Sequence, residues 1–153
     1  MEFPHCIVPK KLDSSGKRKW RVVVDFRKLN DVTVEDSFPI PVISDVLDSL
    51  GKSKYFSTVY CASGFSQIPV RTEDRPKTAF STEYGHFEYK SMPFGLKGAP
   101  ANLQRLMSTV LSGMQGLKCL VYLDIIVFGE TLKVHNDKLR EVFARLGMHN
   151  LKL

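Results

Sequence analysis

Asp124 is the residue with the clearest chemical potential, because it interrupts the most apolar stretch of the chain, Leu117 to Phe128. A charge inside one buried strand would be costly. We therefore expect two short strands that meet at an acidic tip, with Tyr122 and Leu123 just before the aspartate. A carboxylate in that place can bind a metal ion or simply form a turn.

Two further segments have the composition of a ligand site. Glycine and proline are dense from Met92 to Ala101, in the sequence MPFGLKGAPA. Because glycine removes the side-chain obstruction, backbone can approach a ligand closely there. The other segment is basic and could clamp phosphates from both arms of a hairpin, although such a turn is more often a solvated face. Its cations are Lys10, Lys11, Lys17, Arg18, Lys19, Arg21, Arg27 and Lys28.

The elements that must position these residues can be predicted from the sequence pattern. Trp20 to Phe26 contains three consecutive valines and is expected to be a strand. A polar turn should join it to an extended entry from Phe3 to Pro9. Arg27 to Pro41 is expected to be irregular. A helix should begin at Ser44 and end at Gly51, ahead of a strand from Tyr55 to Tyr60.

The second half of the chain adds a hairpin and two helices. The hairpin arms are expected at Thr78 to Phe80 and at His86 to Tyr89. Helices mixed with antiparallel strands predict the α+β class. The first helix begins at Pro100, and its apolar residues repeat at helical spacing: Leu103, Leu106, Met107, Val110, Leu111 and Met114. The second, from Leu132 to Leu146, is basic and should turn Leu139, Val142, Phe143 and Leu146 inward.

Composition indicates one globular domain of 153 residues, with 43% hydrophobic and 25% charged residues. The net charge of +6 suits a polyanionic partner, although an ordinary basic protein has the same charge. Cys6, Cys61 and Cys119 form no zinc motif, so reduced thiols of an intracellular protein are expected. The N-terminus lacks the basic region and apolar stretch that a signal peptide would have, and no apolar run approaches the ~20 residues that a membrane span needs. We therefore expect a soluble protein of the cytoplasm or nucleus, away from membranes.

Four segments, taken in order, resemble the reverse transcriptases of gypsy-type long-terminal-repeat retrotransposons. WRVVVDFRKLN is similar to the family's fingers strand, and FPIPVISDVLDSLGKSKYFST to its next helix and strand. KTAFSTEYGHFEYKSMPFGLKGAPANLQRLM is similar to the hairpin and loop that shape the nucleotide pocket, and VYLDIIVF to the metal-binding hairpin. The resemblance implies a fingers–palm fold with an antiparallel palm sheet backed by helices. The fingers would cover residues 1–54 approximately and the palm residues 55–153, with no thumb, ribonuclease H or integrase domain.

The resemblance also implies a reaction and its participants. Enzymes of this family extend a primer along an RNA or DNA template with deoxynucleoside triphosphates, and three aspartates hold two Mg²⁺ ions. The implied partners are a primer–template, a deoxynucleoside triphosphate and the remainder of a Pol polyprotein. Several residues would contact the substrates: Lys11 and Arg21 the triphosphate, Phe65 the sugar, Phe94 and Gly95 the incoming nucleotide, and Gln104 the template side.

Two of the three expected aspartates are missing. The family reads roughly FSTLDLxSGF where this chain reads FSTVYCASGF, so Tyr60 takes the place of a carboxylate. A phenol is neutral at pH 7 and is no ready metal ligand. The family reads YLDDIIVF where this chain reads YLDIIVF, so Asp124 stands for either the first or the second aspartate of the pair. Because Mg²⁺ needs several hard oxygen ligands, we expect Asp124 to bind it only weakly.

The missing residue has a structural consequence as well. A loss of one residue moves the following strand by one position, and its side chains exchange faces, unless the turn absorbs the change. Three hypotheses for the protein remain: an inactive polymerase domain of transposon origin, a non-enzymatic module that binds nucleic acid or a protein, and a live element whose two losses are sequence errors.

Overall fold

The computed structural model describes residues 4–9, 16, 20–39, 44, 48 and 50–153. The chain divides into two compact units. Unit 1 comprises Met1–Glu35 and Ile68–Ala99, and unit 2 comprises Asp36–Gln67 and Pro100–Leu153. Lys11 and most of the helix expected from Ser44 to Gly51 lie outside the described residues.

In unit 1, two strands form the expected hairpin. Strand β1 (His5–Pro9) pairs antiparallel with β2 (Trp20–Val24), and Ile7 lies opposite Val22. The prediction of irregular structure after β2 is wrong at its start, because α1 (Arg27–Val32) is a helix. Its first turn is held by Asp25, whose carboxylate accepts hydrogen bonds from the Arg27 backbone N–H at 3.0 Å and from the guanidinium group.

The second hairpin of unit 1 exists but is shorter and displaced from the predicted arms. A 3₁₀ helix (Thr72–Thr78) precedes β4 (Phe80–Thr82), which pairs with β5 (Gly85–Phe87). Thr78 therefore ends a helix, although it was predicted in a strand. The two buried residues of the local core are Val24 and Phe26, and the apolar residues packed on them are Leu29, Phe80, Tyr89 and Leu96.

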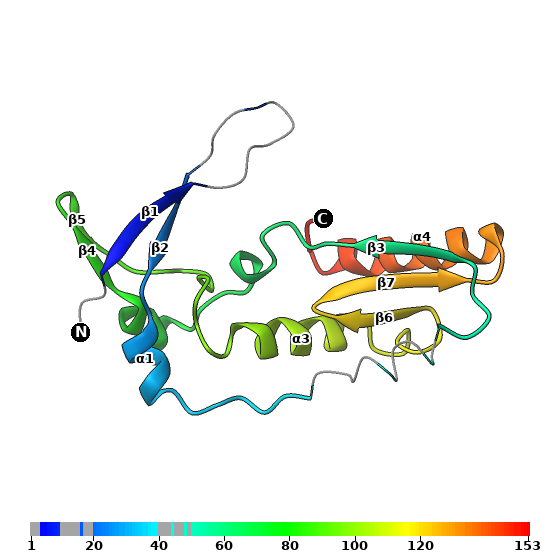
Figure 1. Ribbon diagram of the computed structural model, residues 1–153, viewed down its shortest axis with the longest axis horizontal. Coiled ribbons are helices and arrows are strands. Elements are labelled where there is room, and N and C mark those ends of the chain that lie inside the picture. Colours follow the sequence, from blue (N-terminus) through cyan, green and yellow to red (C-terminus); the bar gives the residue numbers. More distant parts are fainter. Residues whose placement is uncertain (1–3, 10–15, 17–19, 40–43, 45–47, 49) are drawn as a thin grey trace. The chain divides into compact units, whose positions relative to one another are not determined.

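Unit 2 is built on a three-stranded antiparallel sheet. Its strands are β3 (Tyr55–Val59), β7 (Asp124–Gly129) and β6 (Cys119–Tyr122), with β7 in the middle. The long helix α4 (Leu132–Met148) lies alongside β3 and β7, as Figure 1 shows. Helix α3 (Ala99–Val110) completes the unit, together with a 3₁₀ helix at Gly64–Gln67.

The core of unit 2 lies between the sheet and the helices. Alternation along the strands sends Val59, Val121, Ile125 and Val127 inward. Of the inward residues predicted on α4, Val142 and Leu146 are buried, but Phe143 is 43% exposed, so that assignment was wrong. The predicted α+β class is confirmed. No helix of the described part of the chain is long and apolar enough to cross a membrane.

Candidate functional site

The tip of the β6–β7 hairpin carries Asp124, as predicted. Tyr122 pairs directly with Asp124, so that Leu123 alone connects the two strands. Leu123 has a φ of 60°, in the left-handed region that L-residues other than glycine seldom adopt. After this one-residue turn, Ile125 and Val127 are buried and Ile126, between them, is half-buried.

A pair of substitutions measures the strain in this turn. Leu123→Gly should be more stable than Leu123→Ala by about 1 kcal/mol, because both lose the leucine side chain but only glycine enters the left-handed region without a steric cost. Urea denaturation gives the difference. Equal stabilities of the two variants would show that the backbone at this position is not strained.

Gln104 on α3 holds both sides of the tip. Its side chain is 1% exposed, its Nε2 donates to the Val121 carbonyl at 2.9 Å, and its Oε1 accepts from the Leu123 backbone N–H at 2.9 Å. Both ends of the amide are therefore used inside unit 2, on the two sides of Tyr122. The structure gives Gln104 a role in positioning the hairpin, and its assignment to the template side remains a prediction.

The end of β3 lies beside the tip. Val59 pairs with Ile125, so continuing the same register places Tyr60 opposite Asp124. The Tyr60 side chain is 63% exposed. Burial raises the pKa of the Cys61 thiol, and the negative charge of Asp124 raises it further, so Cys61 and Asp124 are neighbours. Partial burial likewise raises the pKa of Asp124 above its ordinary value.

The raised pKa of Asp124 predicts how stability depends on pH. A carboxyl group whose pKa is higher in the folded state opposes folding once it ionises, so this contribution lowers stability as pH rises through the range between the unfolded and folded pKa values. Asp124→Asn should therefore be more stable than the wild type at pH 7, and the two should converge in acid. Thermal unfolding at a series of pH values checks this, and a constant difference would contradict it.

The donors at this tip do not fit a pair of magnesium ions. Across the residues that the structure describes, no group of three or more His, Cys, Asp or Glu side chains could hold a metal ion. Asp124 is a hard oxygen donor, whereas the adjacent Cys61 is a thiol whose ionisation is suppressed. The expected Mg²⁺ chemistry therefore has no complete ligand set here, and no reaction step can be derived through it.

The predicted nucleotide loop lies in unit 1. Gly95 has a φ of +92°, and a Cβ atom there would meet the Phe26 ring at 3.8 Å. Phe94 is 52% exposed. The side chain of Asn30, a residue that the sequence reasoning did not single out, hydrogen-bonds to the loop backbone at Gly95 and Lys97. Nothing in the local sequence marks Asn30, because its partners are 65 and 67 residues away.

The predicted phosphate clamp is described only in part. Lys11 lies outside the described residues, and Arg21 belongs to β2 through its backbone, with its side chain outside the description. Arg27 forms an exposed ion pair with Asp25 at 2.6 Å, and its guanidinium lowers the pKa of Asp25 to about 2. Arg27 therefore serves the start of α1, and its use on a phosphate stays a prediction.

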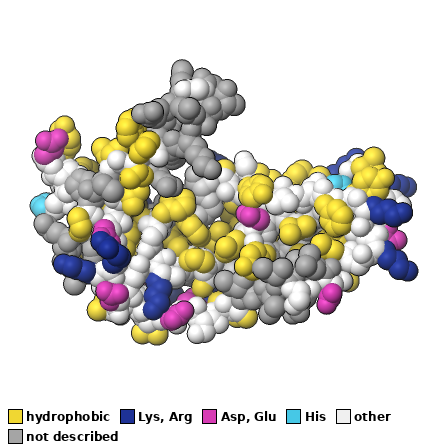
Figure 2. Space-filling model, in the orientation of Figure 1, with side chains coloured by type: hydrophobic (Ala, Val, Ile, Leu, Met, Phe, Trp, Pro, Cys, Tyr) yellow, Lys and Arg dark blue, Asp and Glu magenta, His cyan; other side chains and the backbone are white. Residues whose placement is uncertain are grey.

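The other predicted site residues belong to different units. Phe65 lies half-buried in the 3₁₀ helix of unit 2, where Gly64 packs against Cys61 and Leu103. Asp124, Tyr60, Phe65 and Gln104 are thus in unit 2, whereas Phe94 and Gly95 are in unit 1. In the view of Figure 2, the surface over the sheet of unit 2 is mainly hydrophobic or uncharged, and cations gather where β7 ends and α4 begins.

Comparison with known proteins identifies the family. The family described as "Reverse transcriptase (RNA-dependent DNA polymerase)" matches residues 8–153. The chain is 50% identical over 151 residues to the Pol polyprotein from transposon 297 of Drosophila melanogaster, covering 98% of this chain and 14% of that protein. It is 42% identical over 152 residues to the Pol polyprotein from transposon gypsy of the same fly, covering 98% of this chain and 15% of that protein.

A solved structure agrees with the sequence relatives. The foamy viral protease-reverse transcriptase dRH, solved in complex with double-stranded DNA, matches 99% of this chain and 26% of its own, with a TM-score of 0.83 and 28% identity. The chain spans about a seventh of the length of the Pol polyproteins that it matches. The sequence motifs, the sheet with its acidic hairpin tip and these matches agree, and the chain belongs to the reverse transcriptase family, the RNA-dependent DNA polymerases.

Proposed function

We propose that this chain is a retrotransposon-derived reverse transcriptase domain that no longer adds nucleotides to a primer. The observation that carries the proposal is the sheet tip, where extending the β3–β7 register by one residue places Tyr60 opposite Asp124, and where the hairpin reads YLDIIVF, one aspartate fewer than the motif of the family that the chain resembles. A two-metal site of this family needs three carboxylates, and this sheet tip supplies one, that of Asp124.

The chemistry of the remaining groups supports inactivity. Asp124 supplies one carboxylate, whereas Mg²⁺ needs several hard oxygen ligands. Tyr60 places a phenol where the family that the chain resembles has a carboxylate. With neither ion held, the primer hydroxyl would not be activated and the leaving pyrophosphate would not be stabilised.

A primer-extension assay with Mg²⁺ or Mn²⁺ tests this proposal. We expect no incorporation above that of heat-denatured protein. Incorporation that Asp124→Asn abolishes would overturn the proposal. A repaired protein with Tyr60→Asp and an aspartate inserted after Asp124, fused to the thumb of a related element, should gain activity only when both repairs are present. Activity with one repair would place the defect elsewhere.

We further propose that the domain can still bind nucleic acid without catalysis. The support is the net charge of +6, together with exposed cationic side chains on unit 1 at Lys28, Lys90 and Lys97. The similar foamy viral protein was solved in complex with double-stranded DNA. By analogy, we propose that a nucleic acid is the partner of this chain. The domain would then act as part of a longer polyprotein, as its relatives' names indicate for them.

Titration of labelled RNA/DNA hybrid and single-stranded RNA tests the second proposal. Cationic contacts release counterions, so log K should fall linearly with log salt concentration. Lys28→Ala and Lys90→Ala together should reduce the magnitude of this slope by about 2. Absence of binding at low ionic strength would sink the proposal, whatever the primer-extension result.

A further inference from the structure

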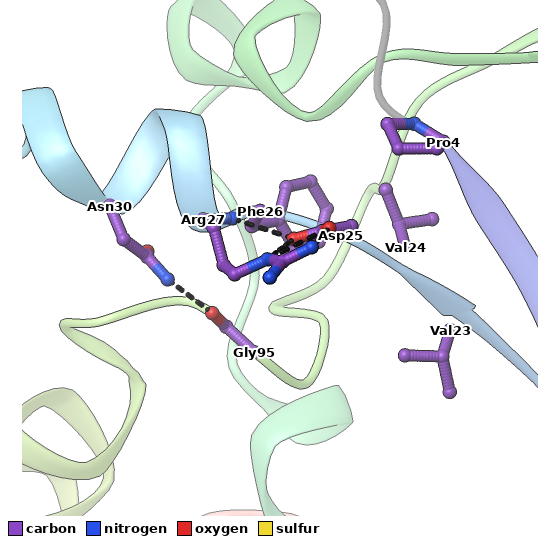
Figure 3. A pocket seen from close by; sticks show the side chains of 8 residues that line it. All are labelled: Pro4, Val23, Val24, Asp25, Phe26, Arg27, Asn30 and Gly95. Atoms are coloured by element: carbon purple, nitrogen blue, oxygen red, sulfur yellow. Dashed lines mark hydrogen bonds and ion pairs between the residues drawn. The ribbon is translucent and has the colours of Figure 1, made fainter.

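We infer that Asn30 is a positioning residue that fixes the loop Phe94–Lys97 and thereby sets how Phe94 is presented to a bound nucleic acid. The second half of this inference rests on the proposed nucleic-acid binding. The first half rests on geometry. Asn30 Nδ2 donates to the Gly95 carbonyl at 2.7 Å, as Figure 3 shows, and the Lys97 backbone N–H donates to Asn30 Oδ1 at 2.8 Å.

The position of the two bonds makes Asn30 effective. One planar amide holds a backbone acceptor on one side of Leu96 and a backbone donor on the other. Leu96 itself packs on the small core of Val24 and Phe26. The loop is therefore held in two ways: the Leu96 side chain packs on the core, and Asn30 binds the loop backbone. Together these contacts restrict the conformation of the loop.

The conformation of the loop requires such support. Gly95 adopts a left-handed φ, which glycine enters without a steric cost. Because glycine is also the most flexible residue, it could easily adopt another conformation if nothing held the loop. Just before the loop, the Met92 N–H donates to the Ile68 carbonyl at 2.8 Å, and just after it the Ala99 N–H donates to the Leu96 carbonyl at 3.1 Å, which closes a local turn. Asn30 supplies a fixed point between these two bonds, next to the exposed Phe94.

Asn30 and Gly95 also share the wall of a pocket. The pocket has a volume of ≈ 440 Å³, and its other lining residues include Val24, Phe26 and the Asp25–Arg27 ion pair (Figure 3). The hydrogen bond between Asn30 and Gly95 closes the wall on that side. Loss of the bond would let the loop move away from α1, changing both the pocket and the position of Phe94.

The side-chain chemistry distinguishes asparagine from its nearest replacements. Asn30→Ala removes both bonds. Asn30→Asp keeps the acceptor for the Lys97 N–H but loses the donor and places a carboxylate against the Gly95 carbonyl, which repels it. Thr33→Val is a matched control at the end of the same helix, because it removes a single side-chain hydrogen bond, from Thr33 to the Leu29 carbonyl at 2.7 Å, without contact to the loop.

Amide hydrogen exchange of the full chain tests the structural half. In Asn30→Ala, the Lys97 amide should exchange about tenfold faster than in the wild type, since a lost hydrogen bond has an energy of about 1.4 kcal/mol at most for a neutral pair. In Asn30→Asp it should remain protected, and in Thr33→Val it should be unchanged. If the Lys97 amide of a folded Asn30→Ala protein exchanges at the wild-type rate, the inference is overturned. If Asn30→Ala does not fold, Asn30→Asp decides: an unchanged affinity of this variant for nucleic acid would overturn the inference.

Titration of the same proteins with labelled RNA/DNA hybrid tests the functional half. Both Asn30 variants should bind several-fold more weakly than the wild type, with an unchanged salt slope because no cation is removed. Thr33→Val should bind like the wild type. Equal affinities in all four proteins would overturn the positioning role even if Lys97 exchanges faster. If the wild type itself does not bind, the proposed nucleic-acid binding fails together with this half, and hydrogen exchange still decides the first.

Discussion

Gly129→Ala should destabilise the protein by about 3 kcal/mol, because the site has no room for a methyl group. A Cβ atom at Gly129 would lie 2.7 Å from the His135 backbone nitrogen and 2.9 Å from its Cα and Cβ. These atoms belong to the first turn of α4, where the His135 N–H also bonds to the Thr131 carbonyl at 2.9 Å. The helix would have to move away from β7, and the contact that closes the core of unit 2 would open.

Gly147→Ala is the matched control for that experiment. Gly147 lies near the end of α4, and nothing approaches the position of its missing Cβ within 4 Å. Because alanine is the better helix former, this change should stabilise the protein by about 0.5–1 kcal/mol. Urea denaturation measures both. A Gly129→Ala protein as stable as the wild type would mean that α4 does not pack closely on the end of β7.

The long helices could be predicted because their apolar residues repeat at helical spacing over several turns. The β6–β7 hairpin could be predicted because a single charge interrupts its apolar run. One charged residue in an apolar run located the β6–β7 tip at Asp124. The helix α1 was missed because six residues are too short for a recognisable apolar stripe, and its start depends on the local carboxylate of Asp25. Phe143 was wrongly predicted to point inward, because the apolar stripe of the sequence is wider than the face that α4 buries.

The candidate site could be located from resemblance, but not its internal connections. The resemblance predicts one aspartate fewer beside Asp124, whereas the left-handed backbone of Leu123 in the one-residue turn is seen only in the structure. Asn30 and Gln104 lie in segments that resemble the family, but their sequence does not reveal which backbone groups they bind. Each reaches backbone that is distant along the chain, and only the folded structure brings such partners together.

These connections also explain how the fold can persist beside a site that we propose to be inactive. The aspartates of a metal site contribute little to folding, since clustered like charges repel each other without their ions. In the proposed inactive domain, Tyr60 and the one-residue turn would remove catalytic groups, while the buried strands are paired. The residue on which the tip depends is instead Gln104, an uncharged side chain in the core.

Gln104→Leu should therefore destabilise the protein by about 2–4 kcal/mol, although leucine is apolar and of similar size. The substitution leaves the Val121 carbonyl and the Leu123 N–H without the partners that Gln104 supplies at 2.9 Å each, and burying an unpaired backbone group costs about 1–3 kcal/mol. The turn at Leu123 should suffer first, because its backbone conformation is already unfavourable. Hydrogen exchange should show the Leu123 amide losing protection before the amides of β7.

Gln115→Leu separates this effect from the general cost of replacing a glutamine. Gln115 is half-buried in the same unit and makes one longer bond, from Nε2 to the Ser108 carbonyl at 3.3 Å. Its loss should cost less than about 1 kcal/mol. Gln104→Glu extends the test, because glutamate keeps the acceptor for Leu123 but turns an oxygen toward the Val121 carbonyl. It should be destabilising at pH 7 and less so in acid, where the protonated carboxyl can donate. If Gln104→Leu and Gln115→Leu are equally stable, the tip does not depend on Gln104, and the shortened turn must be held by its strand pairing alone.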